Sequence, residues 1–112
     1  MNDGERAIRF DGIKQIGCIC CRLDGFDWTY AEVHHQLTTG FHGNGKRLGD
    51  EFTIGLCIYH HRGIRDDSCR WAEGPSYFGN AGDFRQRYGN DAELLVIQNE
   101  FLRAMEFKPW AA

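Results

Sequence analysis

The feature that most constrains this chain is the concentration of cysteine and histidine between residues 18 and 61. All five histidines and four of the five cysteines of the 112-residue chain lie in that stretch. Tetrahedral zinc sites take Cys sulfur and His nitrogen, usually from two pairs of closely spaced residues. Cys18 and Cys21 form a Cys-x-x-Cys pair, and Cys57 and His60 form a Cys-x-x-His pair. The spacing predicts one structural zinc ion held by these four side chains.

The histidines that this zinc site leaves over predict a second, reactive site. His34, His35 and His61 have no further Cys partner pair at zinc spacing. Neighbouring residues point about 100° apart on a helix and to opposite faces on a strand. We therefore expect His60 and His61 to face two different ions. For the same reason His34 and His35 cannot both be ordinary ligands of one ion unless the strand ends or bends there.

The cysteine count favours metal over disulfides as the stabiliser of this small chain. A chain of 112 residues supports one domain, and the glycine-rich middle leaves it a thin core that needs a staple. An odd number of cysteines, with Cys20 next to Cys21, makes a poor disulfide framework. We expect Cys20 to be a small buried residue and Cys69 a plain loop thiol rather than a fifth ligand. A redox Cys-x-x-Cys would need a thioredoxin-like βαβ context, which the sequence lacks.

The pattern of hydrophobic and turn residues predicts a small mixed fold. Residues 1–14 have no clear period and are expected to be a mobile N-terminal lead-in, 15–107 one zinc-stabilised domain, and 108–112 a tail. Within the domain we expect strands at 29–37 and 52–56, a short helix at 58–65, loops at 40–50 and 66–79, and helices at 80–89 and 91–105. Asp91 is the expected cap of the last helix. The chain has no apolar run of about 20 residues and no signal-peptide pattern, so we expect no membrane span and a cytoplasmic location.

These residues resemble a known nuclease superfamily. The Cys-x-x-Cys pair, Ala-Glu-Val-His-His at 31–35 and Leu-Cys-x-x-His-His at 56–61 resemble the HNH (ββα-metal) endonucleases. A longer pattern is similar to the Ref group of phage and prophage proteins, whose namesake is a RecA-dependent nuclease; it comprises segments 47–49, 52–57, 60–63, 74–76 and 84–89. The resemblance implies an α+β fold: a ββα-metal finger with a zinc knuckle, plus flanking helices that include a C-terminal helix at about 91–106.

The resemblance also implies a catalytic site and its cofactors. His34 and His61 would bind the catalytic cation, Mg²⁺ or Mn²⁺ with Zn²⁺ as a substitute, beside the structural Zn²⁺. His35 would be the general base that activates water. A polar residue orients that base in the family, and Asn44 and Asp50 both qualify.

One position departs from the family pattern. Family members commonly have a further His or Asn one turn after His61, where this chain has Arg65. Arginine cannot bind metal, but its guanidinium fork suits a scissile phosphate. His42 is either a solvated loop residue or an auxiliary ligand or phosphate contact.

The overall charge disfavours strong unaided binding to DNA. The net charge is −3, whereas DNA-binding domains usually present a basic face. Lys46, Arg47 and Arg62 are the expected DNA contacts because they flank the proposed site in sequence. The Ref resemblance implies delivery by a partner, a RecA-type recombinase filament, in the cytosol of the host cell. The alternative is a non-catalytic, zinc-stabilised module that binds DNA or protein.

Overall fold

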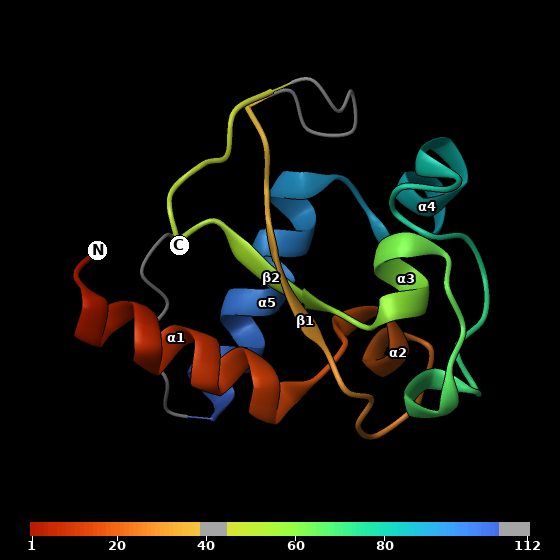
Figure 1. Cartoon of the computed structure of the whole chain (residues 1–112), viewed down its shortest axis with the longest axis horizontal. Helices are drawn as coiled ribbons and strands as arrows, with labels where there is room; N and C mark the ends of the chain where they lie inside the picture. The colour runs from red at the N-terminus through yellow and green to blue at the C-terminus, as the bar shows by residue number, and fades with distance from the viewer. Residues whose placement is uncertain (39–44, 106–112) are drawn as a thin grey trace.

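The computed structural model describes residues 1–38 and 45–105 and confirms the predicted α+β class (Figure 1). One two-stranded sheet is surrounded by helices. In chain order the elements are α1 (Asp3–Ile16), α2 (Ile19–Leu23), β1 (Glu32–His35), β2 (Thr53–Leu56), α3 (Ile58–Arg62), the 3-10 turn η2 (Asp67–Cys69), α4 (Ala81–Tyr88) and α5 (Asp91–Ala104). No helix in the described part of the chain is both long and apolar enough to cross a bilayer.

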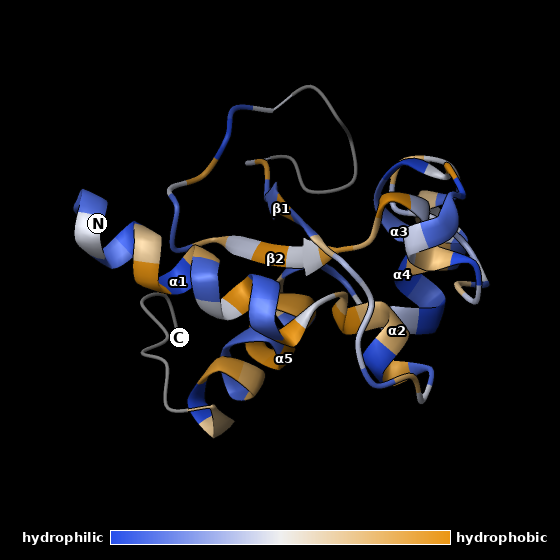
Figure 2. Cartoon of the chain, turned by 60° about the horizontal axis from the view of Figure 1, so that its bottom comes forward, coloured by the Kyte–Doolittle hydropathy of each residue, from blue (hydrophilic) through white to orange (hydrophobic). Residues whose placement is uncertain are grey.

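The sheet is an antiparallel hairpin that leads directly into α3. Val33 pairs with Gly55, and His34 pairs with Ile54. His34 and His35 are the last two residues of the first strand. All four residues of β2 are buried, because α1 and α5 pack against the sheet and against each other. Hydrophobic parts of α5 lie beneath β2, between α1 and α2 (Figure 2). A side chain at Gly55 has no room, since its Cβ would lie 2.8 Å from the Ile13 side chain.

The N-terminal segment is a helix rather than the expected mobile lead-in. Asn2 and Glu5 form a capping box that satisfies the first backbone N–H groups of α1. Ile13 and Ile16 are fully buried beside the sheet. The segment was mispredicted because its buried face also contains a glycine and Arg9, which conceal the helical period.

Arg9 is completely buried and joins three elements. Its Nε donates to Thr53 Oγ1 at 2.9 Å, and its Nη2 donates to the Thr53 carbonyl at 2.7 Å. Its Nη1 donates to Asn99 Oδ1 at 2.9 Å. Burial lowers the pKa of Arg9 to about 10, while the charge of Glu51 opposes that shift. This network ties α1 and α5 to β2. That strand directly precedes Cys57 and His60, the predicted ligand pair at the start of α3.

The last helix is confirmed, but its cap is not the predicted one. Asn90, not Asp91, occupies the N-cap, where it forms a capping box with Glu93. The Asp91 carboxylate instead accepts a hydrogen bond from the Tyr77 hydroxyl at 3.0 Å. Of the residues expected in the core, Leu94, Leu95 and Leu102 are buried, Ile97 and Phe101 are half-buried, and Met105 is exposed. The tail at 108–112 lies outside the described residues.

Candidate metal centre and histidine pocket

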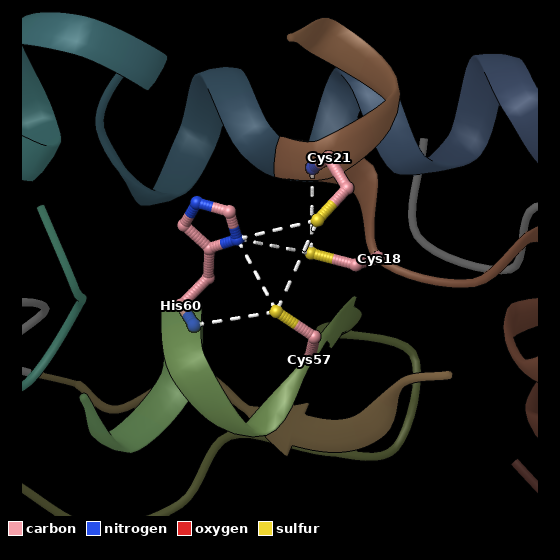
Figure 3. A group of neighbouring side chains, drawn as sticks. All are labelled: Cys18, Cys21, Cys57 and His60. Carbon is pink, nitrogen blue, oxygen red and sulfur yellow. Dashed lines mark hydrogen bonds between the residues drawn. The ribbon is translucent and has the colours of Figure 1, made fainter. Parts of the chain in front are cut away.

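Four buried side chains form a compact group that can hold a metal ion (Figure 3). They are Cys18, Cys21, Cys57 and His60, and their ligand atoms all lie within 4.8 Å of one another. His60 Nδ1 lies 3.5, 3.6 and 3.3 Å from the sulfurs of Cys18, Cys21 and Cys57. A tetrahedral zinc ion, about 2.3 Å from sulfur and about 2.0 Å from nitrogen, separates its ligand atoms by roughly 3.5–3.8 Å. The donor set and its spacing therefore fit a metal such as zinc.

Two short helices produce this convergence in the same way. Cys18 is the N-cap of α2 and accepts a hydrogen bond from the Cys21 backbone N–H. Cys57 is the N-cap of α3 and accepts one from the His60 backbone N–H. In both pairs the first ligand caps the helix and the second follows three residues later. The backbone N–H groups at a helix start favour a thiolate, the form of cysteine that binds metal.

The pKa of Cys18 agrees with that preference. Burial and the contact with Cys57 would raise the pKa, but hydrogen bonds from Cys20, Cys21 and His60 bring it down to about 6. By contrast, burial and the adjacent thiol groups raise the pKa of Cys20 well above its usual value. Cys20 and Cys69 are both buried, and neither belongs to the described group of possible ligands.

His60 is held from behind by groups that the sequence did not reveal. Its Nε2 lies 2.8 Å from the Glu73 carbonyl oxygen and 3.0 Å from the Tyr88 hydroxyl. The Tyr88 hydroxyl donates in turn to Asp24 Oδ2 at 2.6 Å. A proton on Nε2 leaves the lone pair of Nδ1 directed at the three sulfurs, as a metal ligand requires. These partners come from distant loops and helices, so no local spacing could have identified them.

A second histidine group lies where β1 meets α3. His34 Nδ1 is 3.1 Å from His61 Nε2, so one ring nitrogen of each points toward the other. His34 is 4% exposed and packs against the rings of Tyr77 and Phe78. Its Nε2 is buried without a hydrogen-bond partner among the described residues.

The environment of His34 favours a neutral ring. Burial, and then the charges of His61, His35 and Arg47, lower the pKa of His34 to about 3. A neutral imidazole keeps a lone pair for a cation. The pair with His61 can thus supply two ligands to one ion.

His35 has a different set of neighbours from His34. Its Nε2 lies 2.9 Å from Asp50 Oδ1, and its ring meets Phe10 of α1 edge-on. Asp50 Oδ2 is 3.8 Å from the guanidinium of Arg6, also on α1. The contact with Asp50 occupies one ring nitrogen and leaves Nδ1 for another partner. Of the two candidates for orienting His35, Asp50 contacts it, and Asn44 lies outside the described residues.

His34, His35 and His61, the other histidines in the described part of the chain, line one pocket of about 250 Å³. His34 contacts His61, and His35 contacts Asp50. Both histidines nevertheless line the pocket at the end of β1. The lining residues are Val33, His34, His35, Leu37, Arg47, His61 and Phe78. The pocket therefore combines three imidazoles with one exposed guanidinium, a composition suited to a phosphate and a cation.

The other predicted site residues lie outside this pocket. Arg65 stacks over the Tyr59 ring, 4.5 Å from its centroid, and donates to the Arg70 carbonyl. Lys46 is exposed next to Arg47. Arg62 is exposed and pairs with Glu32 at 2.6 Å. His42 falls outside the described residues.

A carboxylate that was not predicted contacts His61. Glu32 Oε1 lies 3.0 Å from His61 Nδ1. Glu32 is two residues before His34, which places both side chains on the same face of β1. This spacing and its place in the Ala-Glu-Val-His-His segment at 31–35 are the sequence signals that could have identified it.

Comparison with known proteins gives one family. A family model described as "Recombination enhancement, RecA-dependent nuclease" matches residues 4–103. Searches of curated proteins and of solved structures return no match.

Proposed function

This chain belongs to the recombination enhancement, RecA-dependent nuclease family, and from that premise we propose that it is an HNH-type endonuclease that hydrolyses DNA phosphodiester bonds. One observation carries the proposal: His34, His35, His61 and Arg47 line a single pocket beside a metal-binding group. The order of the surrounding elements, β1, β2 and then α3, is that of a ββα finger. A nuclease needs a base, a cation and a contact for the phosphate, and this pocket contains side chains for all three.

Two metals have separate places in this proposal. Cys18, Cys21, Cys57 and His60 would hold a structural zinc ion. His34 and His61 would hold Mg²⁺ or Mn²⁺, for which Zn²⁺ can substitute. When bound, the second cation stabilises charge on the phosphate and on the leaving 3′ oxygen.

His35 is the general base in this mechanism. Its Nδ1 takes a proton from the water that attacks phosphorus, because Nε2 is already bonded to Asp50. The Asp50 carboxylate accepts a hydrogen bond from the Nε2–H group, which fixes the tautomer and stabilises the imidazolium that forms. Asp50 is thus the residue that we assign to orienting the base.

Arg47 is the proposed phosphate contact of the pocket. Its guanidinium is exposed and lines the same space as the histidines. Lys46 and Arg62 extend the contact to neighbouring phosphates. Arg65 is not part of this mechanism, because it stacks on Tyr59 outside the pocket.

A partner protein delivers the enzyme to its substrate. With a net charge of −3, the chain has little long-range attraction for DNA. The family description names RecA dependence, and we propose that a RecA-type filament on DNA recruits this chain. The proposed setting is recombination of a phage or prophage in the host cytosol.

Cleavage of plasmid DNA, with and without a RecA-type filament and with Mg²⁺ or Mn²⁺, tests this function. We expect His35→Ala to lower the cleavage rate by 10²–10⁴-fold while the zinc content stays at one ion per chain. Asp83→Asn, an exposed change on α4, is the control and should cleave like the wild type. Full activity of His35→Ala would remove His35 from the mechanism. One bound zinc without cleavage under any condition would favour the non-catalytic binding module.

A further inference from the structure

Glu32 contacts both His61, a proposed cation ligand, and the exposed side chain of Arg62. Its Oε1 lies 3.0 Å from His61 Nδ1, and its Oε2 lies 2.6 Å from Arg62 Nη2. The side chain is 25% exposed, against 13% for His61 and 51% for Arg62. One carboxylate thus reaches a half-buried imidazole with one oxygen and an exposed guanidinium with the other.

This contact determines which nitrogen of His61 carries the proton. A carboxylate only accepts hydrogen bonds, so the ring nitrogen that faces it is the protonated one. With the proton on Nδ1, Nε2 of His61 has a free lone pair. That Nε2 is the atom 3.1 Å from His34 Nδ1, at the proposed cation position. The reverse tautomer would direct an N–H at the cation and remove the ligand.

Arg62 holds Glu32 in the orientation that this contact needs. The Arg62–Glu32 pair is largely exposed, so it adds little to the stability of the fold. The pair instead fixes the orientation of the Glu32 carboxylate, because Arg62 binds Oε2 while Oε1 faces His61. The same arrangement recurs at the base, where Asp50 contacts both His35 and Arg6.

We infer that Glu32 is a positioning residue of the cation site, which holds His61 in the tautomer that binds metal. The inference rests on the proposed function, since it assumes a cation at His34 and His61. It adds a residue that is neither a metal ligand nor the general base. Carboxylate partners of metal-binding histidines typically change metal affinity by 10–100-fold when they are removed.

Two measurements on the zinc-loaded full chain test the inference. Long-range ¹H–¹⁵N NMR before Mn²⁺ is added reports the tautomer of His61, which we expect to be protonated on Nδ1. Electron paramagnetic resonance of free Mn²⁺ then gives the affinity of the cation site. Glu32→Ala should lose the Nδ1–H tautomer and weaken Mn²⁺ binding at least about tenfold. Glu32→Gln should be affected less, because its amide oxygen can still accept the proton of Nδ1.

Controls separate a positioning role from a general loss of structure. Glu100→Gln, an exposed change on α5, should bind Mn²⁺ like the wild type, and every variant should retain one zinc. Unchanged Mn²⁺ affinity in Glu32→Ala, or an unchanged His61 tautomer, would overturn the inference and leave the proposed function standing. A wild type that binds no Mn²⁺ would overturn the cation site and this inference with it.

Discussion

The two histidine sites meet at adjacent residues of α3 but have opposite surroundings. His60 is fully buried, whereas the side chains of His61 and His35 are 13% and 17% exposed. Behind His60 stand a backbone carbonyl and a tyrosine hydroxyl, whereas His61 and His35 each contact a carboxylate. A single residue step along α3, a rotation of about 100°, thus separates a closed site from an open one.

The difference follows from the charge that each site already carries. With zinc bound, three thiolates would leave the buried group with a net negative charge, and a carboxylate in hydrogen-bond contact would add charge where desolvation is costly. The nearby Asp24 carboxylate stays 4.0 Å from His60 Nε2 and is bonded to the Tyr88 hydroxyl instead. The pocket is lined by imidazoles and the Arg47 guanidinium and lies near solvent, so carboxylates there can orient the rings at little cost. A site closed by four protein ligands is typical of structural zinc, and a site with few ligands is typical of catalysis.

The largest expected effect comes from replacing the adjacent residues His60 and His61 separately. His60→Ala should lose the zinc ion and the folded state, because binding of structural zinc contributes about 10–16 kcal/mol in small zinc domains. His61→Ala should retain zinc and melt within a few degrees of the wild type, while its cleavage rate falls at least about 100-fold. Zinc analysis by mass spectrometry, thermal melts and plasmid cleavage measure these outcomes. A His60→Ala chain that keeps its zinc and its melting temperature would abolish the distinction between the sites.

The next effect should change stability without changing either site. Arg9→Met removes three buried hydrogen bonds, two to Thr53 and one to Asn99. We expect a loss of about 3 kcal/mol in the free energy of unfolding, measured with urea, and one zinc per folded chain. Lys14→Met, an exposed change on the same helix, should cost less than about 1 kcal/mol. Equal costs for the two variants would contradict a structural role for the Arg9 network.

A smaller effect should distinguish the base from the cation site within the pocket. Asp50→Asn weakens the acceptor for the Nε2 proton of His35 and should lower kcat about 10–100-fold. Mn²⁺ affinity should stay constant, because Asp50 contacts His35 and not the proposed cation ligands. Steady-state cleavage and Mn²⁺ titration give the two values. Weakened Mn²⁺ binding with unchanged kcat would reverse the assigned roles.

The smallest effect concerns the phosphate contact. Arg47→Ala should reduce cleavage about tenfold, mainly through KM, since it removes one charged hydrogen bond to the phosphate. Arg65→Ala should remain within about twofold of the wild type, because Arg65 stacks on Tyr59 away from the pocket. Initial rates over a range of DNA concentrations compare the two. A larger loss for Arg65→Ala would place the substrate on the other side of α3.

Local spacing was sufficient to predict some parts of the molecule. The ligand pairs Cys18–Cys21 and Cys57–His60 came from spacing alone, and the structure brings them together because each pair spans the first turn of a helix. The last helix was predicted from its period, although its cap was placed one residue too late. The first helix was missed because its buried side includes an arginine, which burial patterns do not anticipate.

The sequence by itself determined which residues form pairs of possible metal ligands, because side chains three residues apart are oriented by one turn of backbone. Only the tertiary structure decided which acceptors stand behind which histidines, since the carboxylates of Glu32 and Asp50 and the backbone carbonyl of Glu73 reach their partners across different elements. Those contacts depend on how the hairpin packs between α1, α3 and α5. Residues that packing brings together have no fixed spacing in the sequence, so the sequence does not reveal them.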